Sequence, residues 1–264
     1  MIQRFDLDSP DDLSAVLQRT TQFGAQIGAF PRRTVYGRAR GLVPVGEAIP
    51  DKLVQPADYK EVIAECHADQ VFPVYHQRES WGPPGTTWDQ NGLNYCWSWG
   101  LTATLMDLRE REGRPTVQLS PVSLGWLVNW RNAGNYLESA IAGAKERGVC
   151  SAAYTPDMHS LRPNRFKDGW EEDAINYRLG EVWDCDPRAM LQHALSVLAT
   201  GTPLYIAYDW WGHALECVGL RWDEKQVNNV VWIVRNSHGE KDVIELTGNR
   251  GLPDEAYGLR ASLT

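Results

Sequence analysis

The apolar residues of this 264-residue chain change their spacing near residue 200, and that change most limits the folds open to it. From Cys96 onward apolar residues recur at helical intervals, whereas the segments after Pro203 are short, rich in Val, Ile, Tyr and Trp, and separated by turn residues. A mostly helical half followed by an antiparallel half predicts an α+β fold. Ligand sites prefer the cleft between two such halves, so we expect a functional site there.

The expected elements follow from apolar stripes and end signals. Leu101, Leu105 and Leu108 lie on one face of a helix that begins at Cys96 and ends before Gly113. Further helices are expected after Ser120-Pro121, over about 135–147, and from Asp186-Pro187 to Gly201. Strands are expected over 203–208, 213–221, 229–236 and 242–246.

Residues 1–70 differ from the rest of the chain. Two short helices are expected there, over 8–23 and 58–67, and the residues between them are interrupted by helix-breaking proline and glycine. We therefore predict an extended N-terminal arm or a pro-segment over 1–70, ahead of a domain over 71–264. That domain is expected to contain a helical lobe over about 88–185 and an antiparallel β-sheet or barrel over about 200–264.

The charge balance and the cysteine pattern argue against several classes of protein. The net charge of −8 disfavours a nucleic-acid partner, because phosphate contacts need clustered Lys and Arg. No apolar run approaches the roughly 20 residues that cross a bilayer, and the first residues lack the apolar region of a signal peptide, so neither a membrane partner nor classical secretion is expected. Five irregularly spaced cysteines favour a reducing compartment such as the cytoplasm.

Four polar residues together suggest nucleophilic chemistry. Cys96 lies at the expected start of a helix, where the helix dipole stabilises a thiolate. Gln90 precedes it by six residues and offers an amide that, with the Cys96 backbone N–H, would stabilise an oxyanion. His213 opens a strand of the other half and is placed to exchange a proton with the thiol, and Asn236 ends a strand where it would orient the imidazole. No metal or cofactor is expected, because His213 and Cys217 lack further ligands.

Three segments that contain these residues are similar to those of papain-like cysteine peptidases. The first is QNGLNYCWSW over 90–99, which has the family's Gln, five intervening residues, and then Cys-Trp-Ser-aromatic. The second is His213-Ala214 followed by Val218-Gly219, and the third is WIVRNSHG over 232–239. They occur in the family's order, and the resemblance extends over roughly residues 70–260.

The resemblance implies a papain-like two-lobed fold and a cysteine endopeptidase that acts on a protein or peptide substrate. By position it implies that Cys96 is the nucleophile, His213 the proton carrier, Asn236 the residue that orients His213, and Gln90 the oxyanion donor. Trp97 and Gly134 match substrate-binding positions of the family.

The chain departs from the family pattern at several positions. Leu93 occupies the place of the family's second cysteine, and the partner cysteine is missing around 132–134, so the usual disulfide is not expected. Ala133-Gly134 stands in place of a Gly-Gly pair that binds substrate backbone. His238 replaces the tryptophan that covers the asparagine, which leaves the expected bond between Asn236 and His213 less shielded.

Two other functions fit the same pattern. The arm and the altered position 238 suit a structural or assembly protein built on this scaffold, for example a virion-associated phage protein with assembly partners on the arm. A transglutaminase-like acyltransferase would share the Cys and His chemistry, but an acidic residue usually fills the third position, so Asn236 favours a peptidase.

Overall fold

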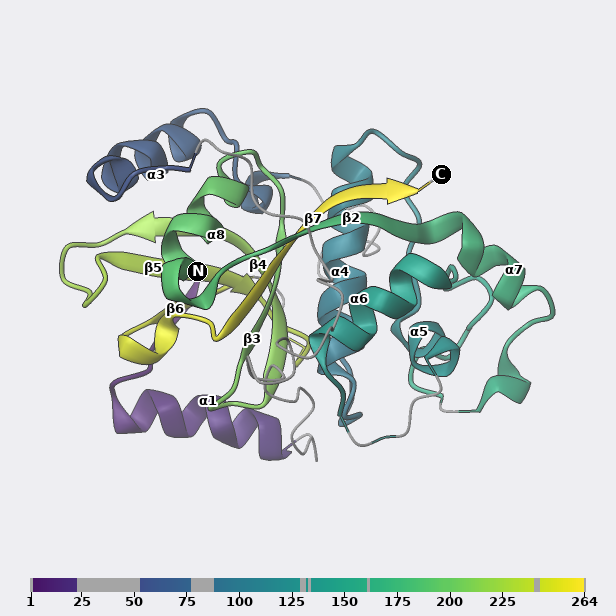
Figure 1. Cartoon of the computed structure of the whole chain (residues 1–264). Coiled ribbons are helices and arrows are strands. Elements are labelled where there is room, and N and C mark those ends of the chain that lie inside the picture. Colours follow the sequence, from purple (N-terminus) through teal and green to yellow (C-terminus); the bar gives the residue numbers. More distant parts are fainter. Residues whose placement is uncertain are drawn as a thin grey trace, which may run out of the picture.

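The computed structural model contains a seven-stranded sheet beside a group of helices (Figure 1). It describes residues 2–22, 53–76, 88–128, 132, 134–160, 162–239 and 243–263. Within these ranges the helices are α1 (Pro10–Gln22), α3 (Tyr59–Ala68), α4 (Cys96–Arg111), α5 (Pro121–Leu127), α6 (Leu137–Glu146), α7 (Trp170–Ala174) and α8 (Met190–Leu198). The strands are β1 (Gln3–Asp6), β2 (Arg178–Asp184), β3 (Leu204–Tyr208), β4 (His213–Trp222), β5 (Val230–Arg235), β6 (Ile244–Thr247) and β7 (Glu255–Leu263). The predicted α+β class is confirmed.

Helix α4 is the central element of the helical lobe. Every residue from Cys96 to Arg109 is buried, so the predicted apolar stripe is only one part of its contact surface. The close approach of α4 to the sheet depends on Gly100, whose Cβ would lie 3.3 Å from the backbone nitrogen of Leu215. A buried helix packed this closely holds its first residue, Cys96, against the start of β4.

The strands run in the order β1-β6-β5-β4-β3-β7-β2. Side chains of β3 alternate between two cores: Tyr205 and Ala207 join the cluster around α4, whereas Leu204, Ile206 and Tyr208 join the cluster around α8. The sheet therefore separates the helical lobe from a second apolar layer. His213 opens β4 opposite Tyr208, and Asn236 directly follows β5, so both lie at the same end of adjacent antiparallel strands.

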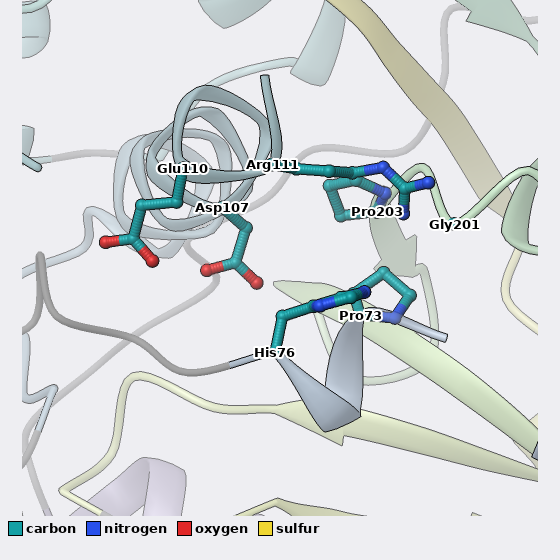
Figure 2. Close-up of a pocket in the computed structure, with 7 residues that line it drawn as sticks. All are labelled: Pro73, His76, Asp107, Glu110, Arg111, Gly201 and Pro203. Atoms are coloured by element: carbon teal, nitrogen blue, oxygen red, sulfur yellow. The ribbon is translucent and has the colours of Figure 1, made fainter. Parts of the chain in front are cut away.

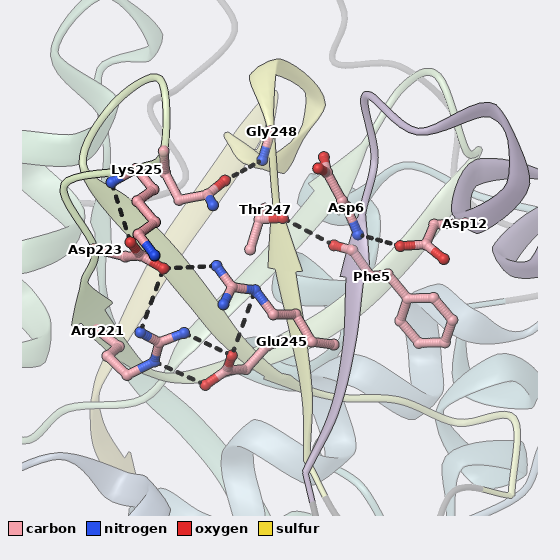
Figure 3. Close-up of polar contacts among 11 residues, drawn as sticks. Phe5, Asp6, Asp12, Arg221, Asp223, Lys225, Glu245, Thr247 and Gly248 are labelled. Carbon is pink, nitrogen blue, oxygen red and sulfur yellow. Dashed lines mark hydrogen bonds and ion pairs between the residues drawn. The ribbon is translucent and has the colours of Figure 1, made fainter.

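The described parts of the N-terminal region pack on the β lobe. Strand β1 pairs in parallel with β6, from Gln3 opposite Ile244 to Asp6 opposite Thr247. Phe5, Val16 and Ile63 are buried in the core around α8. Figure 3 shows β1 beside β6, with Arg221, Asp223 and Glu245 on the adjoining surface. Residues 3–6 of the predicted arm form an edge strand, and the central part of the arm, 23–52, lies outside the described residues.

Three strands were not expected from the sequence. Strand β1 has a single buried apolar residue, Phe5, so it lacks an alternating pattern. Strands β2 and β7 contain Gly180 and Gly258, and their pairing includes register shifts, which interrupt the period of two. Strand β2 lies inside the stretch expected as helical lobe, yet it pairs with β7 at the end of the sheet. The expected strands β3 to β6 pair antiparallel as predicted, and β1, which was not expected, adds one parallel pairing with β6.

Among the described residues, no helix is both long and apolar enough to cross a membrane. All five cysteines are buried free thiols, as the missing disulfide positions predicted. Two residues named in the sequence analysis lie outside the described residues: Asp242, the predicted start of a strand, and Ala133, which precedes the predicted substrate-binding residue Gly134.

Candidate active site

Cys96 is the first residue of α4, and its side chain is completely buried. Its Sγ donates to the Gly212 carbonyl oxygen over 3.9 Å, which places the thiol beside the residue that precedes His213. Burial raises the pKa of the Cys96 thiol to about 12, against the effect of hydrogen bonds from the Ala214 and Trp97 backbone. The helix start alone does not make this thiol acidic, because the loss of water outweighs the N–H groups around it.

His213 and Asn236 form a hydrogen bond at the adjoining ends of β4 and β5. The distance between His213 Nε2 and Asn236 Oδ1 is 2.7 Å, and the two residues are 2% and 4% exposed. Burial lowers the pKa of His213 to about 4, although the bond to Asn236 acts in the opposite direction. The predicted partnership between these two residues is therefore present in the structure.

The orientation of the Asn236 amide fixes the tautomer of His213. The backbone N–H of Ser237 donates to Asn236 Oδ1 over 2.8 Å, and a backbone N–H is only a donor. The atom that faces His213 Nε2 is therefore an acceptor, so Nε2 carries the proton in the neutral ring. Nδ1 is then the basic nitrogen, the atom required to take a proton from a thiol.

Gln90 is held beside the same network. Its backbone N–H donates to the Ser237 carbonyl oxygen over 2.8 Å, and its Oε1 accepts from the Ser237 hydroxyl over 2.6 Å. Its Nε2 donates to the Leu93 carbonyl oxygen over 2.6 Å. Ser237 thus links Gln90 to Asn236, a role that the sequence reasoning did not assign. The amide of Gln90 has a second N–H, which is the donor that an oxyanion would use.

His213 lies against two further aromatic rings. The ring of His238 stacks on it at a centroid separation of 4.3 Å and an angle of 29°. The ring of Trp211 lies 4.5 Å from His213 and meets His238 edge-on at 6.1 Å. His238 therefore does cover the histidine from the position where the family has tryptophan. Trp211 is buried against His213.

The two predicted substrate-binding residues lie in different settings. The side chain of Trp97 is completely buried, so it offers no exposed surface to a substrate, and its backbone oxygen accepts from Tyr205 Oη over 2.6 Å. Gly134 is buried with a φ of +74°, a conformation that favours glycine. Two residues earlier, Asn132 accepts hydrogen bonds from Asn94, which places this segment beside the loop that precedes Cys96.

A charged cluster links the three segments that carry the expected triad. Arg235 directly precedes Asn236, and its Nη1 lies 2.7 Å from Asp107 Oδ2 on α4 and 3.7 Å from Glu216 Oε2 on β4. The three side chains are at most 10% exposed. This cluster therefore joins the helix of Cys96, the strand of His213 and the strand that leads to Asn236.

A cavity of about 200 Å³ lies at the opposite end of α4 from Cys96. Figure 2 shows Asp107 and Glu110 extending from the helix on one side, with Arg111 beside Pro203 and His76 below. Its lining includes none of the four predicted catalytic residues. The cavity is therefore separate from the candidate active site.

Comparisons with known proteins show the fold. No family model matches the sequence, and no curated protein matches it. Among solved structures, xylellain, a cysteine protease from Xylella fastidiosa, is 18% identical and has a TM-score of 0.54, covering 84% of this chain and 99% of its own. Digestive procathepsin L2 from the larval midgut of Tenebrio molitor is 14% identical with a TM-score of 0.55, covering 94% of this chain and 80% of its own. Procathepsin L 3 from the same tissue is 14% identical with a TM-score of 0.52, covering 96% and 99%. The chain has a divergent papain-like fold, as its three sequence segments predicted.

Proposed function

We propose that this protein is a thiol peptidase in which Cys96, His213 and Asn236 hydrolyse peptide bonds, with Gln90 as an oxyanion donor. The observation that carries the proposal is the 2.7 Å bond between His213 and Asn236, beside a cysteine that begins the buried helix of a papain-like fold. Side chains from both lobes meet there. This is the arrangement that nucleophilic catalysis by a thiol requires.

The reaction begins with a proton transfer from the Cys96 thiol to His213 Nδ1. The thiolate attacks the peptide carbonyl carbon, and the resulting oxyanion accepts from the Gln90 amide and the Cys96 backbone N–H. The imidazolium then protonates the leaving amine as the C–N bond breaks, which leaves a thioester on Cys96. Water, deprotonated by His213, attacks the thioester and releases the acid product with the thiol restored.

The resting pair is neutral in the closed site. Burial raises the pKa of Cys96 to about 12 and lowers that of His213 to about 4, so thiol and imidazole both lack charge at neutral pH. Charge separation therefore needs water or a polar substrate beside Cys96. We propose that substrate binding opens this site and that proton transfer accompanies it.

A covalent probe tests the proposal directly. An epoxide inhibitor of thiol peptidases should add once to the native protein, at Cys96, and should not add to Cys96→Ala. Cys150→Ala is the matched control, because burial also raises the pKa of the Cys150 thiol to about 12, while its Sγ donates to the Ser151 carbonyl oxygen rather than to the segment of His213. The control should keep the adduct and hydrolyse a fluorogenic peptide like the native protein. Folded native protein that neither reacts nor hydrolyses peptides would overturn the proposal.

One observation favours the assembly alternative. Cys96 is completely buried, and a scaffold protein has no need of an accessible thiol. Under this alternative the segment with β1 and α1 is a docking arm rather than a removable pro-segment. Mass spectrometry of active protein separates the two roles: loss of the N-terminal region on activation supports a pro-segment, and a full-length active protein supports an arm.

A further inference from the structure

The stack of two imidazole rings at the candidate site has a consequence for proton transfer. His213 and His238 lie 4.3 Å apart with an interplanar angle of 29°, and both are buried. We propose that His238 is a positioning residue that competes with His213 for a single proton and thereby turns the peptidase down as the pH falls. The inference rests on the proposed function, since it concerns the proton that His213 must carry.

Two positive rings are not stable in this stack. At 4.3 Å, with water excluded, like charges repel strongly, so only one of the two imidazoles is protonated at a time. In the proposed reaction His213 must hold a proton to give to the leaving amine. A proton on His238 opposes that state, and the population able to react then decreases.

The surroundings favour placing that proton on His238. Two described titratable residues adjoin His238: His213 on β4, whose ring stacks on it, and Asp89 in the segment before α4, whose backbone pairs with it. The backbone of Asp89 forms an antiparallel bridge with His238. One oxygen of the Asp89 carboxylate accepts from the Asn91 backbone N–H over 2.7 Å, and the other would lie 3.2 Å from a Cβ on Gly239. This negative charge therefore adjoins the residue that follows His238 and favours positive charge in the segment. His213 instead faces the neutral amide of Asn236 and the ring of Trp211.

The position of His238 in the chain explains why the competition reaches the reaction. It follows Ser237, which hydrogen-bonds both Asn236 and Gln90. Movement of a protonated His238 away from His213 would pull on this same segment. The effect of His238 is therefore transmitted through the stack and through the backbone that carries the orienting amide.

The pH profile of kcat/KM tests the inference. Hydrolysis of a fluorogenic peptide is measured for the native protein and two variants. His238→Trp keeps an aromatic ring that does not titrate, and His238→Gln removes both the aromatic ring and the titratable group. Each profile is scaled to its own plateau. The native profile should have an acid ionisation that both variants lack, so the ratio of variant to native activity should rise about tenfold for each pH unit below it. His159→Gln is the control, because His159 bonds the backbone oxygen of Asp89 but lies outside the stack, and it should retain the native profile.

A second measurement does not need activity. In ¹⁵N-histidine NMR spectra of Cys96→Ala, the ring nitrogens of His213 and His238 should titrate together with the uptake of one proton, and His238→Gln should abolish the shared shift. Identical scaled acid limbs in the native protein, His238→Trp and His238→Gln, or independent titration of the two rings, would overturn the inference. Absence of hydrolysis and of Cys96 labelling in the native protein would instead overturn the peptidase proposal, while the NMR titration would still decide the role of His238.

Discussion

At the centre of the sheet, β4 and the end of β5 hold His213 and Asn236 in a 2.7 Å hydrogen bond with the two residues 2% and 4% exposed. At the β1 edge, Arg4 and Asp223 form an ion pair of the same length, but the Arg4 side chain is 40% exposed. Water screens the edge pair and is excluded from the central one. The two contacts have the same length, but loss of the central one should cost more free energy of unfolding. Removing a buried partner leaves a polar group that water does not reach.

Loss of His213 should have the largest effect. His213→Ala removes the proposed proton acceptor of Cys96, so the rate of peptide hydrolysis should fall about 10³-fold, and the rate of epoxide labelling should fall with it. His67→Ala serves as the control, because His67 bonds Tyr75 and the Leu220 carbonyl away from the stack. Equal labelling rates for native protein and folded His213→Ala would contradict a catalytic role for the central pair.

The charged cluster beside the proposed triad should show the next effect, on stability. Arg235→Met leaves the buried carboxylates of Asp107 and Glu216 without this cation, so the free energy of unfolding should decrease by about 3–5 kcal/mol in urea titrations. Arg260→Met is a matched change, since Arg260 pairs with Glu181 where the side chains are 43% and 46% exposed. It should cost less than about 1 kcal/mol. Similar losses in the two variants would show that burial does not govern these pairs.

The central pair should also make stability depend on pH. Burial lowers the pKa of His213 from 6.5 to about 4, so between these values the unfolded chain binds a proton that the folded chain does not. The free energy of unfolding should therefore decrease by about 3 kcal/mol as the pH falls from about 6.5 to about 4, and this contribution is constant above that range. His213→Gln should have a shallower pH dependence in urea titrations at pH 7 and pH 4. An unchanged dependence would mean that His213 is readily protonated in the folded state.

Sequence reasoning located the centre of the sheet well. Cys96, His213 and Asn236 each lie in a short segment whose residue types and local context could be recognised together, and the two strands that carry His213 and Asn236 were predicted within a residue or two. The neutral state of Cys96 and His213 was not predicted from the sequence. It arises from burial by the whole fold, and no local pattern encodes the exclusion of water from Cys96.

The edges of the sheet were the part that the sequence concealed. Strand β1 has four residues with one buried side chain, and its partner β6 lies about 240 residues away along the chain. Trp97 shows the same limit at the site, because its position in a motif suggested substrate contact and the tertiary structure buries it completely. Contacts made by distant segments, rather than local propensity, decide both cases.

The smallest expected effect is at the β1 edge itself. Arg4→Ala removes the 2.7 Å pair with Asp223 and the weaker 3.9 Å contact with Glu245, but Arg221 continues to pair with both acids (Figure 3). Tm should therefore fall by less than about 2 °C at low salt, and the difference should decrease in about 1 M NaCl, where the Debye length shortens to about 3 Å. The Arg4 guanidinium holds the pKa of Asp223 below its usual value, so the contribution of the pair should also decrease when acid protonates Asp223.

Phe5→Ala, one position along, provides the contrast within the same strand. Its side chain is 3% exposed in the core around α8, so its removal should lower Tm far more than Arg4→Ala does and should be insensitive to salt. If Arg4→Ala proved as damaging as Phe5→Ala, the exposed ion pair would anchor β1. The edge would then resemble the centre of the sheet, where polar contacts determine the structure. If Phe5→Ala alone released β1, the edge would depend on apolar burial, and the buried polar contacts at the centre would be particular to the candidate active site.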